Sequence, residues 1–324
     1  MQNTHSRYYF TRLSNEQKPI YGDILNSLYN QQKNVRIPAP FKIDAIIKTA
    51  RGVLFDNPEL FYVDAVEIPY SYNSSRAVIS FNFLYSAAEI GRMTRSIQNK
   101  TQPLLQKISN YTDYDKEKEI HDFLARNVKY NETKSSDPVL HNISGALTDG
   151  SAVCSGYSSA FKYLCDLSGM SCIYVSGEAV DLNEVKETHA WNIIKINGSC
   201  YHVDVTWNSM LRLKNGDCYD YFNISDAYMK LDHMWDTQNY PQCGVMSGMI
   251  PYFTSGSDFK AHIAAQLKSK NKNFSMRVNK KFRNEEEIYS IIQDAIPLVS
   301  RIFVRGIALR YNKKQDIINI CINP

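Results

Sequence analysis

The chain has 324 residues, of which 44% are hydrophobic and 22% charged, with a formal net charge of +4. These values are ordinary for a globular protein, and the length allows two or three domains with a sizeable core. No run of lysine and arginine interleaved with aromatic residues occurs, which excludes nucleic acid as an expected partner. The seven cysteines lack Cys-x-x-Cys spacing, which argues against a disulfide framework and a zinc ribbon. We therefore expect no cofactor and no metal.

The first 110 residues are expected to form a small α+β domain, residues 1–110. Its opening segment lacks the apolar core of a signal peptide, and no stretch of the chain is long and apolar enough to span a bilayer. Taken alone, this predicts a cytoplasmic protein. Helical spacing of apolar residues predicts helices over residues 14–29, after Pro40 and over 87–108, and strand-like runs occupy residues 61–72 and 77–85.

A central domain, residues 111–250, is predicted next, and its most informative run is GSAVCSGYSSAFKYLCDLSG at residues 150–169. Apolar residues recur from Cys154 at helical spacing and Gly169 supplies a stop, so a helix is predicted to begin at the cysteine. Free backbone N–H groups and the helix dipole stabilise negative charge at that end. Cys154 is therefore the candidate thiolate nucleophile.

A base for this thiol is predicted on a hairpin. The runs HAWNIIKI (189–196) and SCYHVDVTW (199–207) flank Asn197-Gly198, a strong signal for a two-residue turn. In that register Trp191 would pair with Asp204 and His189 with Thr206, which puts His189, Trp191 and Asp204 on one face. Asp204 would then orient His189 toward the thiol. A polar loop at residues 177–188 is predicted to border the cleft.

Other residues near the nucleophile are interpreted with open alternatives. Trp191 and Trp207 either wall the substrate pocket or pack in the core, and a continued strand would turn Trp207 away from Asp204. The backbone N–H of Cys154 is the default oxyanion donor. Gly150 and Ser155 are further oxyanion or pocket candidates, and no second donor is identified. His202 and His233 are interpreted as structural.

Together, the segments around Cys154, His189 and Asp204 resemble the core of the transglutaminase-like superfamily, specifically its bacterial cysteine-peptidase-like branch. The resemblance covers roughly residues 111–250. It implies an α+β, papain-like core with the nucleophile helix packed on an antiparallel sheet. It also implies Cys154 as nucleophile, His189 as base and Asp204 as orienting carboxylate, acting on a protein or peptide substrate. Many relatives act outside the cell, so a cell-surface location and a cell-wall substrate stay open beside the cytoplasm.

The remaining residues, 251–324, are predicted to form a C-terminal α+β module with helices over 258–268 and 284–298, a strand near 274–278 and a hairpin across 302–322.

Three functions are weighed. The favoured one is hydrolysis of a peptide or amide bond through a thioester, because the resemblance is closer to bacterial peptidase-like members and no calcium loop of the EF-hand type is present. The second is transglutaminase-type acyl transfer to an amine. The third is a non-catalytic scaffold that holds peptide or glycan.

Overall fold

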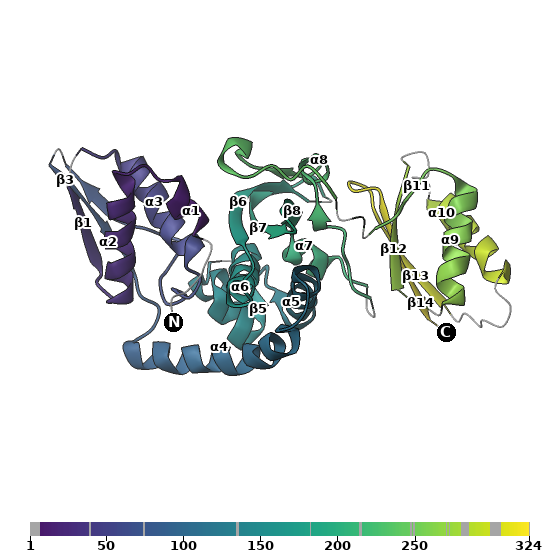
Figure 1. Ribbon diagram of the computed structural model, residues 1–324, viewed down its shortest axis with the longest axis horizontal. Helices are drawn as coiled ribbons and strands as arrows, with labels where there is room; N and C mark the ends of the chain where they lie inside the picture. The colour runs from purple at the N-terminus through teal and green to yellow at the C-terminus, as the bar shows by residue number, and fades with distance from the viewer. Residues whose placement is uncertain are drawn as a thin grey trace.

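The computed structural model describes residues 7–323 except 39, 74, 134–135, 182, 214–215, 247, 249, 270, 272, 280–284 and 299–305. Three assemblies of helices and strands follow one another along the long axis of the molecule (Figure 1). Most strand pairs are antiparallel, and helices and strands are interspersed along the chain. The chain therefore has the α+β fold that the sequence predicts.

The N-terminal part combines three helices with a small sheet of strand order β1-β3-β2. Its elements are α1 (Tyr8–Arg12), α2 (Gln17–Tyr29), β1 (Asn34–Pro38), α3 (Ile43–Asp56), β2 (Tyr70–Tyr72) and β3 (Arg76–Ser80). The strand predicted at residues 61–72 is wrong for most of its length. Phe61 and Tyr62 are buried side chains of a turn, and Val63 forms only an isolated antiparallel bridge with Phe83. The apolar character of this run reflects burial in the core more than strand pairing.

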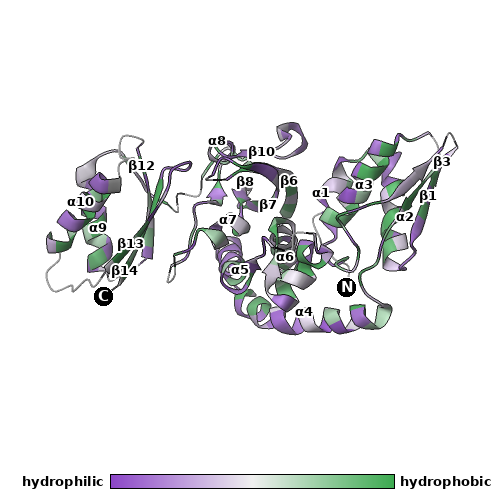
Figure 2. Ribbon diagram, turned by 180° about the vertical axis from the view of Figure 1, so that it is seen from behind, coloured by the Kyte–Doolittle hydropathy of each residue, from purple (hydrophilic) through white to green (hydrophobic). Residues whose placement is uncertain are grey.

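A long helix, α4 (Ala87–Ile108), runs along the base of the molecule from the N-terminal part to the central one (Figure 1). These are the predicted bounds, and in the structure Ser86 and Glu89 form a reciprocal capping box at the start of the helix. Hydrophilic and hydrophobic residues alternate along it (Figure 2). Within the described parts of the chain, no helix has the length and apolar character needed to cross a membrane.

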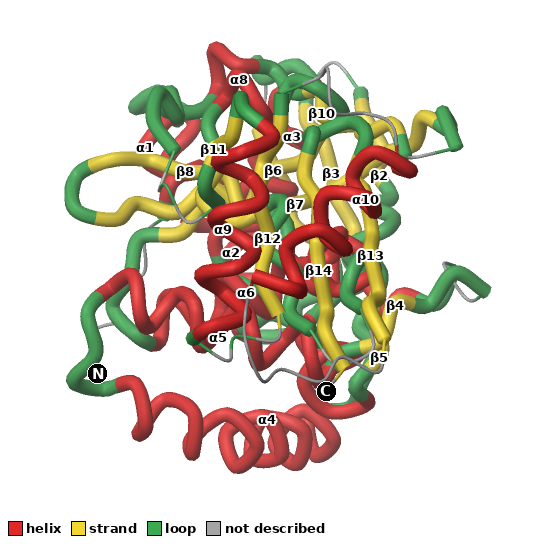
Figure 3. Tube along the Cα trace, turned by 90° about the vertical axis from the view of Figure 1, so that its right-hand side faces the viewer, coloured by secondary structure: helices red, strands yellow, loops and turns green. Residues whose placement is uncertain are grey.

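The central part is built on a five-stranded antiparallel sheet of order β10-β6-β7-β8-β9. Helices α5 and α6 pack together, and α6 covers β6 and β7 (Figures 1 and 3). Its helices and turns are α5 (Asp113–Asn127), η1 (Pro138–His141), η2 (Gly145–Asp149), α6 (Cys154–Leu167), α7 (Val205–Met210), α8 (Asp226–Met229) and η3 (Thr237–Asn239). Its strands are β4 (Lys129–Tyr130), β5 (Ser151–Ala152), β6 (Cys172–Val180), β7 (Lys186–Ile196), β8 (Ser199–Val203), β9 (Phe222–Ile224) and β10 (His233–Met234).

The loop predicted at residues 177–188 is shorter than expected. Strand β6 continues to Val180 and β7 begins at Lys186, so only the turn between them lacks strand structure. Backbone pairing of polar residues extends the strands into the region that composition alone marks as loop.

The C-terminal part has its own sheet of order β11-β12-β14-β13, with helices on one side (Figure 1). Its elements are β11 (Tyr252–Phe253), α9 (Gly256–Lys268), β12 (Asn273–Val278), α10 (Glu285–Ala295), η5 (Ile296–Leu298), β13 (Gly306–Asn312) and β14 (Ile317–Asn323). The predicted hairpin corresponds to β13 and β14, although its expected start at residue 302 lies outside the described residues.

The buried hydrophobic residues of the described chain form three clusters. One lies wholly within the C-terminal part and includes Phe259, Ile263 and Ile320. A large cluster joins residues of the N-terminal part to the face of the central sheet that α6 covers, and a third contains Trp191 and Tyr221. The proposed division at residues 110 and 250 stays a prediction.

A buried acid in α5 makes stability depend on pH. Glu117 is fully buried, and its Oε2 accepts a hydrogen bond from Asn223 Nδ2 at 2.7 Å. Burial raises the pKa of Glu117 to about 8 from an ordinary 4.5. At pH values between these two pKa values, the Glu117 carboxyl is ionised in the unfolded chain and protonated in the folded chain. Rising pH then lowers the unfolding free energy, by up to about 1.4 kcal/mol per pH unit from this group.

The Glu117→Gln substitution should therefore raise the unfolding free energy more at pH 8 than at pH 5. Urea unfolding of wild type and variant at both pH values measures this difference. Glu119→Gln, on the same helix at a partly exposed position beside Lys107, serves as the matched control. A stability difference between wild type and the Glu117→Gln variant that is the same at pH 5 and pH 8 would contradict the buried, protonated state.

Candidate active site

The candidate nucleophile opens α6, as predicted. Val153 is extended, with φ −97° and ψ 179°, and Cys154 is the first helical residue. Gly156 in the first turn is required by packing, because a Cβ there would lie 2.2 Å from the backbone oxygen of Leu140. The thiol is half-buried at the end of the helix where backbone N–H groups point outward.

The hairpin forms in the predicted register. Asn197 and Gly198 both have positive φ, and Ile196 pairs with Ser199. The pairing ends at Asn192 and Val203, however, so the expected pairs of Trp191 with Asp204 and of His189 with Thr206 are wrong. The chain leaves the strand at Asp204, which caps α7, and Thr206 is helical.

This early strand ending still brings Asp204 to His189. His189 Nε2 lies 2.8 Å from Asp204 Oδ2, while Asp204 Oδ1 accepts the backbone N–H of Trp207 at 3.0 Å. The Cys154 side chain lies within hydrogen-bonding range of His189. With Nε2 on the carboxylate, Nδ1 is the ring nitrogen left for the sulfur. The structure thus brings Cys154, His189 and Asp204 together in the predicted order.

Burial, neighbouring charges and hydrogen bonds set the charge states of His189 and Asp204. Burial by itself lowers the pKa of His189, but the Asp204 charge and the hydrogen bonds to Asp204 and Cys154 raise it to about 10. Burial raises the pKa of Asp204, yet the charge of His189 and the hydrogen bonds from His189 and His233 hold it well below its ordinary range. At neutral pH the pair is an imidazolium facing a carboxylate, and the Cys154 side chain lies beside the imidazolium.

A second histidine contacts the same carboxylate, which the sequence interpretation missed. His233 in β10 lies with Nε2 3.2 Å from Asp204 Oδ2 and Nδ1 2.6 Å from Asp232 Oδ1. Asp232 Oδ2 also accepts hydrogen bonds from Tyr221 Oη at 2.7 Å and from Gln315 Nε2 at 3.0 Å. Gln315 belongs to the C-terminal part, so a continuous polar chain links that part to His189.

We expect His233 to position Asp204. His233→Phe keeps a ring between Trp191 and Trp207 but removes the donor to Asp204, so the rate of Cys154 alkylation at pH 6 should fall about tenfold. His233→Gln retains a donor and should stay within about threefold of wild type. Mass spectrometry of the Cys154 peptide measures both rates. Equal loss in the two variants would argue for a packing role instead.

The two tryptophans occupy different positions around His189. Trp191 is fully buried beneath it, with ring centroids 6.1 Å apart, and donates its Nε1–H to His202 Nδ1 at 3.0 Å. It is a core residue that supports the site. Trp207 is half-buried, and its ring centroid lies 5.4 Å from that of His189. The turn into α7, which a continued strand would not make, places Trp207 on the His189 side.

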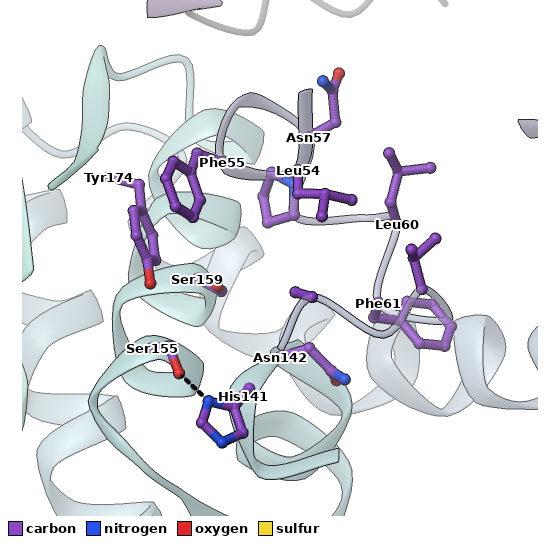
Figure 4. Close-up of a pocket in the computed structure, with 13 residues that line it drawn as sticks. Leu54, Phe55, Asn57, Leu60, Phe61, His141, Asn142, Ser155, Ser159 and Tyr174 are labelled. Carbon is purple, nitrogen blue, oxygen red and sulfur yellow. Dashed lines mark hydrogen bonds between the residues drawn. The ribbon is translucent and has the colours of Figure 1, made fainter. Parts of the chain in front are cut away.

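Gly150 and Ser155 were predicted as oxyanion or pocket residues, and the structure gives both of them contacts elsewhere. Gly150 has φ +66° and ends η2, and its carbonyl accepts the backbone N–H of Lys129. The Ser155 hydroxyl lies 2.8 Å from His141 Nδ1, in a separate small cavity of about 80 Å³ that also includes Phe55, Leu60 and Tyr174 (Figure 4). This cavity brings the N-terminal part within one residue of Cys154. Neither residue lines the second, larger cavity, which lies beside His189.

A larger cavity of about 410 Å³ lies beside His189. Trp207 and Thr206 line it from α7, Glu187 from β7 and Tyr130 from β4. Burial raises the pKa of Tyr130 well above its ordinary value, and the nearby charges of Cys154, Glu187, Asp204 and Glu132 raise it further. The Tyr130 hydroxyl therefore stays neutral within electrostatic reach of the thiol.

Two groups of side chains have the composition and spacing of metal ligands. The first is His189, Asp204 and His233, and the second is His202, Asp226 and Cys243. In the second, His202 Nδ1 accepts from Trp191, so a neutral ring carries its proton on Nε2, 2.8 Å from Asp226 Oδ1. That nitrogen then has no lone pair for a metal. In the first, both Nε2 atoms already face the Asp204 carboxylate.

A cysteine at a helix start, packed on an antiparallel sheet that carries a histidine and is followed by an aspartate, defines a papain-like α+β domain. Residues 102–210 match the family model of the transglutaminase-like superfamily, so this segment is a transglutaminase-like domain. Thiol-dependent chemistry on amide bonds is the general activity associated with that superfamily.

Three solved structures are similar to parts of the chain. A provisionally named cysteine protease from Cytophaga hutchinsonii is 21% identical, with TM-score 0.29, over 43% of this chain and 61% of that one. A provisionally named protease from Parabacteroides distasonis is 8% identical, with TM-score 0.27, over 42% of this chain and 30% of that one. A protein named as a TGase is 12% identical, with TM-score 0.30, over 69% of this chain and 59% of that one. This chain thus spans less than two thirds of each. No curated protein matches it significantly.

Proposed function

We propose that the protein is an enzyme that cleaves an amide or peptide bond with Cys154 as nucleophile, His189 as acid and base, and Asp204 as the carboxylate that orients His189. The observation that carries the proposal is the His189 contact set: Asp204 at 2.8 Å on Nε2 and Cys154 within hydrogen-bonding range. A purely structural domain has no need of this buried, charged combination.

The chemistry proceeds in two balanced steps. The Cys154 thiolate attacks the carbonyl carbon, and a tetrahedral oxyanion forms near the backbone N–H of Cys154. As the C–N bond breaks, the His189 imidazolium transfers its proton to the leaving amine, which leaves a thioester on Cys154. Water then attacks the thioester, His189 takes a proton from it, and release of the carboxylic acid regenerates the Cys154 thiolate beside the His189 imidazolium.

Hydrolysis and acyl transfer differ only in what attacks the thioester. An amine in place of water would give a new amide bond and the transglutaminase reaction with the same residues. We favour hydrolysis, as the sequence interpretation does. A scaffold that only holds peptide or glycan is the alternative of another class, and the buried ion pair at His189 counts against it.

The test is the rate at which iodoacetamide alkylates Cys154 as a function of pH. An ordinary thiol has a pKa of about 8.5 and is almost entirely protonated at pH 6. Paired with the imidazolium, Cys154 should react at pH 6 at nearly its full rate. His189→Ala should slow that reaction by roughly tenfold to several hundredfold.

The other cysteines report on folding in the same experiment, because Cys165, Cys172 and Cys218 are buried and should stay unlabelled in both proteins. Slow labelling of Cys154 with an ordinary thiol profile in wild type and variant alike would reject the enzymatic proposal and favour the scaffold.

A further inference from the structure

The polar chain that begins at His189 ends in the C-terminal part of the molecule. Gln315 lies in the turn between β13 and β14, and its side chain is fully buried. Its Nε2 donates one hydrogen bond to Asp232 Oδ2 and another to the backbone oxygen of Tyr228, each at 3.0 Å. A carboxylate and a backbone carbonyl can only accept, so these two partners fix which end of the Gln315 amide faces them.

The backbone of Gln315 is held as well. Its N–H donates to Asn312 Oδ1 at 3.2 Å, and its carbonyl oxygen accepts from Arg277 Nη1 at 2.8 Å. The Arg277 guanidinium also stacks on Tyr228, 3.7 Å from the ring centroid, and the backbone oxygen of Tyr228 is the other acceptor for Gln315. The Gln315 amide is therefore a preorganised donor for Asp232.

Asp232 transmits this contact to His233. Its Oδ1 lies 2.6 Å from His233 Nδ1, and its Oδ2 also accepts from Tyr221 Oη at 2.7 Å. The other ring nitrogen of His233 lies 3.2 Å from Asp204 Oδ2, the oxygen that also contacts His189. Each nitrogen of the His233 ring thus faces a carboxylate, so the ring cannot turn over without losing both contacts.

Other hydrogen bonds across the same boundary do not lead to the site in this way. Asp220 accepts hydrogen bonds at 2.9 or 3.0 Å from three side chains of β13 and β14, namely Arg310, Asn312 and Asn319. Among the described contacts, Asp220 has no hydrogen bond to Asp232 or His233. Gln315 differs from residues that only join the two parts, because its acceptor directly contacts a histidine of the site.

We propose that Gln315 is a positioning residue for the proposed active site. It holds Asp232, and Asp232 orients the His233 ring on the Asp204 carboxylate. This inference rests on the proposed function. It makes the C-terminal part a component of the active site, because one of the donors to Asp232 comes from the β13–β14 turn.

The test is a double-mutant cycle in the full chain, with the rate of Cys154 alkylation at pH 6 as the readout. Gln315→Met keeps the length of the side chain but removes the donor, and should slow alkylation about threefold. His233→Phe should slow it about tenfold. Adding Gln315→Met to His233→Phe should cause no further loss, because the effect of Gln315 passes through His233.

Two further variants separate positioning from general loosening of the boundary. Gln315→Asn, which suits a turn, withdraws the amide by one methylene and should slow alkylation as Gln315→Met does. Asn319→Leu is the matched control, because it removes a hydrogen bond to Asp220 across the same boundary and should leave the rate unchanged. An additive loss in the double variant, an equal loss in Asn319→Leu, or an unchanged rate in both Gln315 variants would overturn the inference.

Nitrogen-detected NMR of the His233 ring gives a readout that does not depend on the thiol. Gln315→Met should shift the ring-nitrogen resonances of His233, and Asn319→Leu should leave them in place. Slow alkylation of the wild type at pH 6 would reject the proposed function, while the His233 resonances would still show whether Gln315 acts on the ring. Resonances that stay the same in Gln315→Met would count against the positioning role.

Discussion

Asp204→Asn is expected to lower the pKa of His189 from about 10 toward its ordinary value near 6.5, and to abolish nearly all of the proposed amide-cleaving activity. The substitution keeps the shape of the side chain but removes the charge that opposes the burial of an imidazolium. An amide also cannot accept from His189 and His233 and at the same time accept the Trp207 N–H, since one of its two ends is a donor. Loss of the orienting carboxylate in such triads lowers kcat by about 10⁴-fold.

Two measurements that need no substrate check this expectation. Nitrogen-detected NMR of the His189 ring gives its pKa, and Cys154 alkylation at pH 6 should slow at least about tenfold. Asp226→Asn is the matched control, because Asp226 lies 2.8 Å from His202 in an equivalent contact outside the site. A His189 pKa that stays near 10 in the Asp204 variant would show that Asp204 does not maintain the imidazolium.

Lys162→Met is expected to destabilise the protein by about 3–5 kcal/mol. Lys162 lies in the middle of α6, the helix that begins at Cys154, and its Nζ donates to both oxygens of Asp166 at 2.9 and 3.1 Å. It also donates to the backbone oxygen of Cys172 in β6, at 3.1 Å. Both charged side chains are 1% exposed, so removal of the lysine would leave a buried carboxylate without its cation.

The loss of stability in the Lys162→Met variant should depend on pH. Burial raises the pKa of Asp166 to about 7 even beside Lys162. Without the lysine it rises further, so the folded variant binds a proton that the unfolded chain has lost, and its stability falls as pH rises. Urea unfolding should thus show a smaller penalty at pH 5 than at pH 8.

Two further variants make the Lys162 prediction specific. Lys162→Met combined with Asp166→Leu should recover most of the lost stability, since an apolar pair replaces the charges. Lys186→Met breaks an exposed ion pair with Glu178 and should cost less than about 1 kcal/mol. A double variant no more stable than Lys162→Met alone would be evidence against the uncompensated charge as the cause.

Much of the site was accessible from the sequence. The start of α6 at Cys154 follows from apolar residues at helical spacing, and the β7–β8 register follows from Asn197 and Gly198, whose positive φ only certain residues adopt easily. These are preferences of a few adjacent residues, so they can be derived without knowledge of the rest of the chain. The meeting of Cys154 with His189 and Asp204 was an implication of the resemblance to the transglutaminase-like superfamily.

The residues at which the strands end could not be predicted from local sequence patterns. The Asp204 N–H bonds to the carbonyl of Tyr221, beside β9, and the chain turns into α7 at that point. A partner outside the hairpin therefore ends the strand, and this ending moves Trp207 to the side of His189. The strand predicted over residues 61–72 was wrong for most of its length for a related reason, because burial of a loop and burial of a strand select the same residue types.

The sequence by itself determined the start of the helix at Cys154 and the turn of the hairpin at Asn197 and Gly198, because each depends on spacing within one short segment. Only the tertiary structure decided which residues surround them. His233 contacts Asp204, which is 29 residues away in the sequence, and Gln315 contacts Asp232, which is 83 residues away. Glu132 and Glu187 line the same cavity. Such contacts depend on how β10, the C-terminal part and β4 pack against the central sheet, and no local pattern of residues encodes that packing.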